Sequence, residues 1–247
     1  MDNYTKLKEI TSKWKLLVAA DIVAFSFQER QLKVLLVKRK FEPGVGDWAI
    51  PGGFVREDES LEEAALRELK EETGLARDCY LEQLYTFGEV TRDPRGRVIS
   101  VAYMVLINEP ASTRSTNSSN RGEPEKLRLK ASDDATDAQW FPVDDLPPLS
   151  FGAAHRKILE YARQRLHWKL EYSNVAFGLL GAHFTLTELQ RLYESVYNEK
   201  LDKRNFRKKI LSLDLVEPID KVLNELGRPA QLYKARTKKL KIYTRIV

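Results

Sequence analysis

The sequence has almost no cysteine and no long apolar segment, and each absence excludes a class of protein. Cys79 is the only cysteine in 247 residues, so an internal disulfide framework is excluded and a reducing compartment is favoured. No apolar run approaches the roughly 20 residues that a membrane-spanning helix needs. Residues 1–17 contain several lysines rather than the apolar centre of a signal peptide. We therefore expect a cytoplasmic protein without a membrane partner.

The charge of the chain is divided unevenly between its two parts. Residues 151–247 carry 20 Lys and Arg against 10 Asp and Glu, a net charge of +10, whereas residues 1–150 carry 21 against 26, a net charge of −5. A basic segment suits an anionic macromolecule, and an acidic segment suits cations. A solvated basic surface is the simpler alternative for the second part. With 43% hydrophobic residues, the chain can form one or two cores.

The first part alternates between strand-like and helix-like segments. Two apolar runs, residues 19–27 and 33–38, predict a β-hairpin. Ser60 and Glu63 have the spacing of a capping box, and Gly74 can end the helix that they begin. We expect further strands at residues 48–50, 80–90, 98–107 and 138–143. This order predicts a mixed α/β sandwich.

Composition also suggests where the chain divides. Residues 111–132 are rich in Ser, Thr, Asn and charge without helical or strand periodicity, which predicts a mobile surface loop. A helix is expected over residues 153–168, after the Pro147-Pro148 pair. We therefore expect a first domain at 1–150, a connecting helix at 151–172 and a second domain at 173–247.

Three glutamates of the predicted helix are candidate metal ligands. A helix turns by about 100° per residue, so Glu68, Glu71 and Glu72 fall within one arc roughly 100° wide. Carboxylates placed together repel each other unless a cation is present, and oxygen ligands suit Mg²⁺ or Mn²⁺. Leu66, Leu69 and Thr73 are expected on the other side, under the sheet. A solvated acidic face is the alternative.

The same segment resembles the signature of the Nudix family. The pattern runs from Gly53 through Glu59 and the stretch Arg67-Glu-Leu-Lys-Glu-Glu-Thr-Gly-Leu75, and every defined position matches. The resemblance implies an α/β/α sandwich with a mixed sheet. It also implies a metal site formed by Glu68, Glu71, Glu72 and the carbonyl of Gly53, in which Arg67 holds a carboxylate in position. If the protein is an active hydrolase, Glu71, Glu68 and Arg67 would be its catalytic residues.

A second segment, residues 92–100, is similar to a loop of the Nudix proteins that act on ADP-ribose. Its guanidinium groups can bind phosphates in a bidentate manner, whereas the alternative is a charged hairpin turn. Gly52 lets the backbone approach a ligand closely, and Arg39 ends a predicted strand. The candidate ligand-binding residues are Arg39, Gly52, Arg92, Asp93, Arg95 and Arg97.

The second part has the pattern of a helix-turn-helix. Apolar residues recur with helical spacing in residues 184–197, and Thr187 can cap that helix. Asp202 can cap a second helix over residues 203–213, on which Phe206, Ile210 and Leu213 form the apolar stripe. Two short strands at 215–219 and 231–234 would form the wing. The candidate DNA-binding residues are Thr187, Lys203, Arg204, Asn205, Arg207, Lys208, Lys209 and Arg228. A small helical dimerisation module is the alternative.

Together the two parts resemble the Nudix-related transcriptional regulators of the NrtR family. The resemblance implies an α+β chain in which a Nudix domain precedes a winged helix-turn-helix domain. In that family the Nudix domain senses ADP-ribose or a related NAD metabolite, and the winged domain binds operators of NAD-metabolism genes until the ligand releases it. A homodimer is expected because such regulators usually read two half-sites.

Two other functions remain open at this point. The signature is often degraded in these regulators, whereas here it is complete, so the chain could also be a Mg²⁺-dependent ADP-ribose pyrophosphatase with an accessory basic domain. A sister group of regulators senses arabinose, but such a pocket has no need of a complete signature. A sensor needs different ligand affinities in its DNA-bound and free states and does not need turnover.

Overall fold

A computed structural model describes residues 16–75, 79–108, 135–223, 229–237 and 239–243 of the chain, with backbone alone at 221–223. The loop expected at 111–132 and the candidate DNA contact Arg228 lie outside the described residues.

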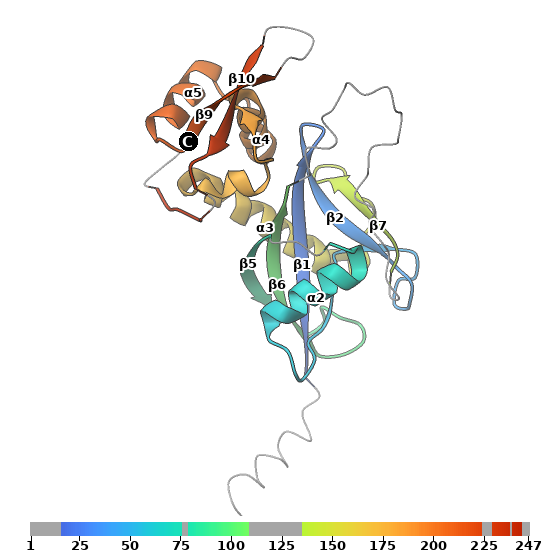
Figure 1. Cartoon of the computed structure of the whole chain (residues 1–247). Coiled ribbons are helices and arrows are strands. Elements are labelled where there is room, and N and C mark those ends of the chain that lie inside the picture. Colours follow the sequence, from blue (N-terminus) through green and yellow to red (C-terminus); the bar gives the residue numbers. More distant parts are fainter. Residues whose placement is uncertain (1–15, 76–78, 109–134, 224–228, 238, 244–247) are drawn as a thin grey trace, which may run out of the picture.

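The described elements follow the predicted order of strands and helices (Figure 1). In chain order they are β1 Leu17–Gln28, β2 Gln31–Arg39, β3 Trp48–Ala49, β4 Gly52–Phe54, α2 Leu61–Thr73, β5 Tyr80–Phe87, β6 Val98–Ile107, β7 Ala135–Pro142, α3 Gly152–Tyr172, the 3₁₀ helix η2 Asn174–Gly178, β8 Phe184–Thr185, α4 Leu186–Tyr197, α5 Lys203–Ser212, β9 Val216–Leu223 and β10 Ala230–Ala235.

The first seven strands form one mixed sheet around β1. This strand runs parallel to β6 along most of its length, and its other edge pairs antiparallel with β4 near one end and with β2 near the other. Strand β5 extends the sheet beyond β6, and β7 and β3 pair with β2. The predicted hairpin of β1 and β2 is confirmed.

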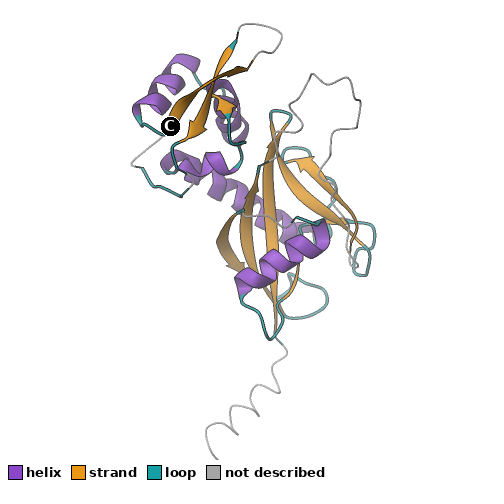
Figure 2. Ribbon diagram, viewed as in Figure 1, coloured by secondary structure: helices purple, strands orange, loops and turns teal. Residues whose placement is uncertain are grey.

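One helix covers each face of this sheet, as Figures 1 and 2 show. Because side chains alternate along a strand, Ile22 and Ala24 of β1 pack with Leu69 of α2, whereas Val23 and Phe25 pack with α3. The layers therefore form the expected α/β/α sandwich, with one apolar core on each side of the sheet.

Helix α2 begins and ends where the sequence predicts. Ser60 and Glu63 form both hydrogen bonds of the capping box, and Gly74 takes a left-handed conformation (φ 72°). One part of the prediction is wrong, because Leu66 is 42% exposed. The buried arc of α2 is centred near Ala65 and Glu72, and Leu66 lies about 100° away from it around the helix.

The second unit is a winged helix-turn-helix. Helix α4 packs against α5 through Tyr193 and Phe206, whose rings are 5.3 Å apart. Strands β8, β10 and β9 form a separate sheet in that order. Asp202 caps α5 through the backbone N–H of Asn205, as expected. The cap of α4 is Thr185 and not Thr187, because Thr185 forms a capping box with Glu188.

Helix α3 joins the two units. Its apolar face belongs to the same core as the strands β1 and β6, and that core continues into α4 and α5. Beside α3, the backbone N–H of Leu32 on β2 donates a hydrogen bond to Ser195 Oγ of α4 (2.8 Å). Among the described residues, no helix combines the length and the apolar composition needed to cross a membrane.

Thr185, at the start of α4, provides a test of the cap. We expect Thr185→Ala to lower the free energy of unfolding by about 1 kcal/mol, because the N–H of Glu188 loses its acceptor. Thr187 has a contact of its own with Arg207, so the matched control is Thr91→Ala, at an exposed turn position, which should change the free energy of unfolding by less than about 0.5 kcal/mol. Urea titrations of both variants measure this, and equal losses in the two would contradict the assignment.

Candidate functional sites

Arg67 is the centre of a cluster of carboxylates on helix α2. Its guanidinium donates to both oxygens of Glu59 (2.7 and 2.6 Å), to Glu68 (2.5 Å) and to Glu71 (3.0 Å). Hydrogen bonds from Arg67 lower the pKa of Glu59 to about 2, whereas burial raises the pKa of Glu68 despite the same neighbour. Arg67 therefore holds Glu59 ionised and brings Glu68 and Glu71 together.

The third glutamate of the predicted metal site binds a different partner from Glu68 and Glu71. Glu72 is buried in the arc that faces the sheet, and it accepts the backbone N–H of Gly52 (2.8 Å). Among the described residues, no group of three or more His, Cys, Asp or Glu side chains is arranged to hold a metal ion.

The oxygen donors still suit a hard cation. A Cβ on Gly53 would lie 2.1 Å from Oε1 of Glu68, so the glycine is what permits that carboxylate to approach the backbone. Glu68 and Glu71 both face the Arg67 guanidinium, which shows that a positive charge is accommodated between them. Carboxylate and carbonyl oxygens are the ligands that Mg²⁺ and Mn²⁺ take in proteins.

A small cavity beside Gly53 collects most of the candidate ligand-binding residues. Its free volume is about 50 Å³, and it is lined by Ala19, Asp21, Arg39, Ile50, Gly52, Gly53, Phe54, Arg92, Asp93, Arg95, Phe151 and His155. Arg97 lies elsewhere, donating hydrogen bonds to the carbonyls of Gly88 (2.7 Å) and Glu89 (3.1 Å). Arg97 is therefore a hairpin-turn residue, which was the alternative for this loop, while the other five candidates line the cavity.

Ion pairs neutralise two of the cavity's arginines. Arg92 pairs with Asp21 (3.0 Å), and both side chains are almost fully buried; Ser100 also donates its hydroxyl to Asp21. Asp93 accepts from the backbone and the guanidinium of Arg95 (2.7–3.0 Å). Burial alone would raise the pKa of Asp93, but these hydrogen bonds lower it. The cavity therefore contains several charged side chains whose positive and negative charges nearly cancel.

Aromatic rings close the cavity against these arginines. The ring centre of Phe151 lies 4.8 Å from the Arg39 guanidinium and 5.2 Å from that of Arg95, which also lies 4.8 Å from Phe54. Pockets for small ligands usually have a volume of about 300–1,000 Å³. A nucleoside diphosphate can therefore enter only after some of these side chains move, and Arg95, whose side chain is 38% exposed, is the most accessible.

Besides the apolar Ala19 and Ile50, sequence reasoning missed four polar or aromatic residues of this cavity, namely Asp21, Phe54, Phe151 and His155. None belongs to the signature or to the arginine loop, and they come from β1, β4 and the start of α3. Phe151 has a left-handed backbone (φ 56°) at the first turn of α3. Only the packing of α3 across the sheet brings these residues together.

The candidate DNA-binding residues of α5 form one exposed basic face. Lys203, Arg204, Asn205, Lys208 and Lys209 are exposed, and Arg204 and Lys208 lie on the side of the helix opposite Phe206. Arg207 is half-buried and donates to Thr187 Oγ1 (3.1 Å), so these two residues tie α5 to α4. The face has the composition of a recognition helix, with side chains that suit bases and phosphates.

The cations of the wing sheet are arranged differently. Lys234 pairs with Glu217 (2.7 Å), and Arg236 pairs with Asp214 (2.9 Å) and with Glu217 (3.3 Å). After β10, Asn174 accepts the backbone N–H of Lys241 (2.7 Å) and donates to the carbonyl of Lys239 (3.0 Å). The ion pairs lie within residues 214–236, whereas the hydrogen bonds of Asn174 fasten the segment after β10 to the end of α3.

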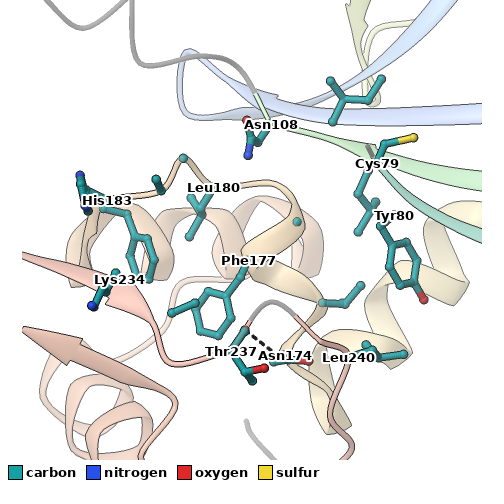
Figure 3. A pocket seen from close by; sticks show the side chains of 18 of the residues that line it. Cys79, Tyr80, Asn108, Asn174, Phe177, Leu180, His183, Lys234, Thr237 and Leu240 are labelled. Atoms are coloured by element: carbon teal, nitrogen blue, oxygen red, sulfur yellow. Dashed lines mark hydrogen bonds between the residues drawn. The ribbon is translucent and has the colours of Figure 1, made fainter. Parts of the chain in front are cut away.

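A second and larger cavity, of about 610 Å³, lies between the two units (Figure 3). Its wall is mostly apolar and includes Leu106 and Asn108 at the end of β6, Phe177 and Leu180 after α3, and Lys234 of the wing sheet. No sequence pattern pointed to it. On this side the winged unit leaves space against the sheet, in contrast to the close contact of α4 with β2.

Comparison with known proteins agrees with this combination of sites. Residues 15–162 match the NUDIX domain family, and residues 176–235 match the NrtR DNA-binding winged helix domain. A repressor of Acinetobacter baylyi described as an "ADPR responsive transcriptional repressor" is 34% identical over 220 residues, which cover 88% of this chain and 81% of that protein. The chain belongs to the NrtR family.

Solved structures support the family assignment over the whole length. NrtR of Shewanella oneidensis in complex with a 27mer DNA is 34% identical, with a TM-score of 0.73, covering 93% of this chain and 99% of that one. The NUDIX domain of the same protein in complex with ADP ribose is 33% identical (TM-score 0.52), covering 67% of this chain and 99% of that one. The predicted Nudix and winged helix fold is confirmed.

The burial of His155 leads to a prediction about how the stability of the protein depends on pH. Burial, opposed by Asp21 and reinforced by Arg92 and Arg39, lowers the pKa of His155 to about 4, from about 6.5 in an unfolded chain. Between these pH values the unfolded state binds the proton and the folded state does not. The free energy of unfolding therefore rises with pH across this window, and the contribution of His155 reaches its full value above about pH 6.5.

We therefore expect the wild-type protein to lose about 3 kcal/mol of stability from pH 7 to pH 4 through this group. His155→Phe should lack this part of the loss, because phenylalanine has no proton to bind. Urea unfolding at a series of pH values compares the two, and parallel pH profiles would contradict a buried neutral histidine.

The exposed face of α5 gives a second prediction. Arg204→Ala should weaken binding to a specific operator by about 1–3 kcal/mol if the guanidinium reads a base, and should weaken nonspecific binding much less. Arg156→Ala, at an exposed position of α3, is the matched control, because it removes the same charge from a residue outside the proposed DNA contacts. Fluorescence anisotropy with operator and scrambled duplexes measures both. An equal loss on the two duplexes would make Arg204 a phosphate contact.

Proposed function

We propose that the protein is a transcriptional repressor that binds operator DNA through α5 and is released by ADP-ribose bound in its Nudix domain. The observation that carries this proposal is the position of α3. Its first turn supplies Phe151 and His155 to the ligand cavity, and its apolar face shares a core with the winged unit. A single helix thus connects the cavity with the core of the winged unit. The Acinetobacter relative, described as responsive to ADPR, supports the same conclusion.

The closed cavity indicates how a ligand would act on the repressor. A ligand shifts an equilibrium only if it binds one state more tightly than the other. With about 50 Å³ free, the described cavity is smaller than a usual ligand pocket, so a nucleoside diphosphate would bind there most tightly in a state whose side chains have moved. Displacing Arg39 or Arg95 from Phe151 changes the contacts at the first turn of α3, and we propose that this change reaches the winged unit.

We propose that a divalent cation, Mg²⁺ or Mn²⁺, accompanies the ligand. Glu68, Glu71, Glu72 and the carbonyl of Gly53 would hold it, with Glu59 and Arg67 orienting Glu68 and Glu71. Bound there, the cation would neutralise the diphosphate of the ligand beside the acidic helix. The supporting observations are the all-oxygen donor set and the approach of Glu68 to Gly53.

For the DNA complex we propose a homodimer on a two-fold operator, because helix-turn-helix regulators usually read two half-sites. The exposed contacts would be Lys203, Arg204, Asn205, Lys208 and Lys209, with Arg207 and Thr187 supporting them from the junction of the two helices. Arg228, outside the described residues, is proposed to reach DNA from the wing. The proposed targets are NAD-metabolism genes.

ADP-ribose hydrolysis is the second candidate function. It is favoured by the complete acidic signature and by an ADP-ribose pyrophosphatase of Methanocaldococcus jannaschii, which is 36% identical over 162 residues, covering 66% of this chain and 82% of that protein. A general base is also required. The acidic residues Glu123 and Glu125 lie outside the described residues, and no described residue is assigned this role.

A gel-shift titration tests the proposal. The full chain should shift a duplex from the upstream region of its own gene, and ADP-ribose with Mg²⁺ should abolish the shift. Arabinose at the same concentration should leave the complex intact. Failure to form any specific complex would overturn the repressor assignment, and release by arabinose alone would place the protein with the sugar-responsive regulators.

The same samples separate sensing from turnover. If the protein is a sensor, AMP should form from ADP-ribose no faster than in a Glu71→Gln variant, measured by chromatography over the course of the titration. Rapid Mg²⁺-dependent formation of AMP that Glu71→Gln abolishes would establish the hydrolase instead.

A further inference from the structure

A network of polar side chains joins the second half of α3 to strand β5. Glu82 on β5 accepts a hydrogen bond from Arg165 (2.9 Å) and pairs with Lys169 (2.6 Å). The Tyr80 hydroxyl donates to the same carboxylate and accepts from Lys169 (2.9 Å). The side chains of Glu82, Arg165 and Lys169 are only 12–24% exposed. This contact between the helix and the sheet is therefore polar and largely shielded from water.

The network favours one position of α3 on the sheet. Burial alone would raise the pKa of Glu82, but the hydrogen bonds from Lys169, Tyr80 and Arg165 lower it, so the carboxylate is ionised near neutral pH. Separating it from α3 would leave two partly buried cations without their counterion, which is costly. Hydrogen bonds are also directional, whereas apolar packing is not. The network therefore fixes the position of the helix more sharply than the apolar core does.

This network lies at the end of α3 where the chain enters the winged unit. The carbonyl of Lys169 accepts the backbone N–H (2.9 Å) and the hydroxyl (2.6 Å) of Ser173, which begins η2. A Cβ on Gly178, at the other end of η2, would lie 3.9 Å from the Cβ of Tyr80, so η2 passes close to the same strand. Strand β5 thus holds both α3 and the segment that follows it.

The ligand cavity lies at the opposite end of the same helix. Phe151 and His155 line it, whereas Glu82, Arg165 and Lys169 lie outside its lining. With about 50 Å³ free, a nucleoside diphosphate would bind most tightly in a state whose cavity is larger. A shift of α3 that enlarges the cavity has to distort the directional contacts of Glu82. The network would then oppose ligand binding without touching the ligand.

We propose that Glu82 is a positioning residue that holds α3 in the operator-binding position and so sets how much ADP-ribose is needed to release the operator. This inference rests on the proposed repressor function and adds the residue that regulates its response. When the binding-competent state is a minor one, the apparent affinity is reduced by the fraction of protein in that state. Weakening the network should therefore raise the affinity for ADP-ribose, whereas loss of a ligand contact or of folded protein would lower it.

Calorimetric titration of the full chain with ADP-ribose in Mg²⁺ tests this assignment. Glu82→Gln keeps the shape of the side chain but removes its charge, so the Kd for ADP-ribose should fall about tenfold, within the usual range of coupling between sites. The operator Kd without ligand should change less than about twofold, because the described state still predominates. Fluorescence anisotropy with a duplex from the upstream region of its own gene measures this second constant.

Two further variants show whether the gain in affinity comes from the network. Lys169→Met removes one cation and leaves Glu82 paired with Arg165, so the Kd for ADP-ribose should fall by a smaller factor. No cation loses its counterion in this variant, so it remains informative if Glu82→Gln does not fold. Glu160→Gln, at an exposed position of α3, removes a carboxylate outside the network. It is the matched control and should bind ADP-ribose and operator as the wild type does.

The results also separate this inference from the proposed function. If the wild-type protein does not bind ADP-ribose, or binds it without releasing the operator, the repressor function fails and this inference fails with it. If ADP-ribose releases the wild type but the folded network variants bind ADP-ribose no more tightly than the wild type does, only the role of Glu82 is overturned. A gain in affinity for Glu160→Gln equal to that for Glu82→Gln would also overturn it, because any lost negative charge would then suffice.

Discussion

Helix α3 buries one apolar face against the sheet and against the winged unit at the same time, and the other contacts of the protein are arranged around it. Ile158, Ala162, Leu166 and Leu170 of this face are fully buried. Each large side chain of this kind contributes about 1.5–3 kcal/mol. Because one core serves both units, α3 cannot shift against the sheet without changing the packing of α4 and α5. In the proposed repressor, a change at the start of this helix would therefore reach α4 and α5 through the shared core.

Electrostatics set the second constraint, because the ligand cavity contains its own counterions. Asp21 and Asp93 already form ion pairs with Arg92 and Arg95. Arg67 already pairs with Glu59, Glu68 and Glu71. An anionic ligand has to compete with these pairs, and breaking a buried pair is costly unless new partners replace the old ones.

The sequence was most informative where structure depends on near neighbours. Capping residues and apolar spacing located α2 and α5 within a residue or two, because a helix is fixed by contacts three and four positions apart. The same reasoning was less accurate at α4, where Thr185 and Thr187 both have the chemistry of a cap and only the backbone geometry chooses between them. It was wrong for Leu66, whose exposure depends on which side of α2 meets the sheet.

Short-range patterns of residue type and spacing were enough to show that the chain combines a Nudix signature with a basic helix-turn-helix. The folded structure was needed to show that Glu72 accepts the N–H of Gly52 while Glu68 and Glu71 pair with Arg67, that Arg97 closes a turn, and that Phe151 and His155 complete the cavity. Phe151 and His155 lie about a hundred positions from Gly52 and Gly53, and only the crossing of α3 over the sheet places them together. Since that crossing is fixed by the burial of apolar side chains from many distant positions, no local pattern could have predicted it.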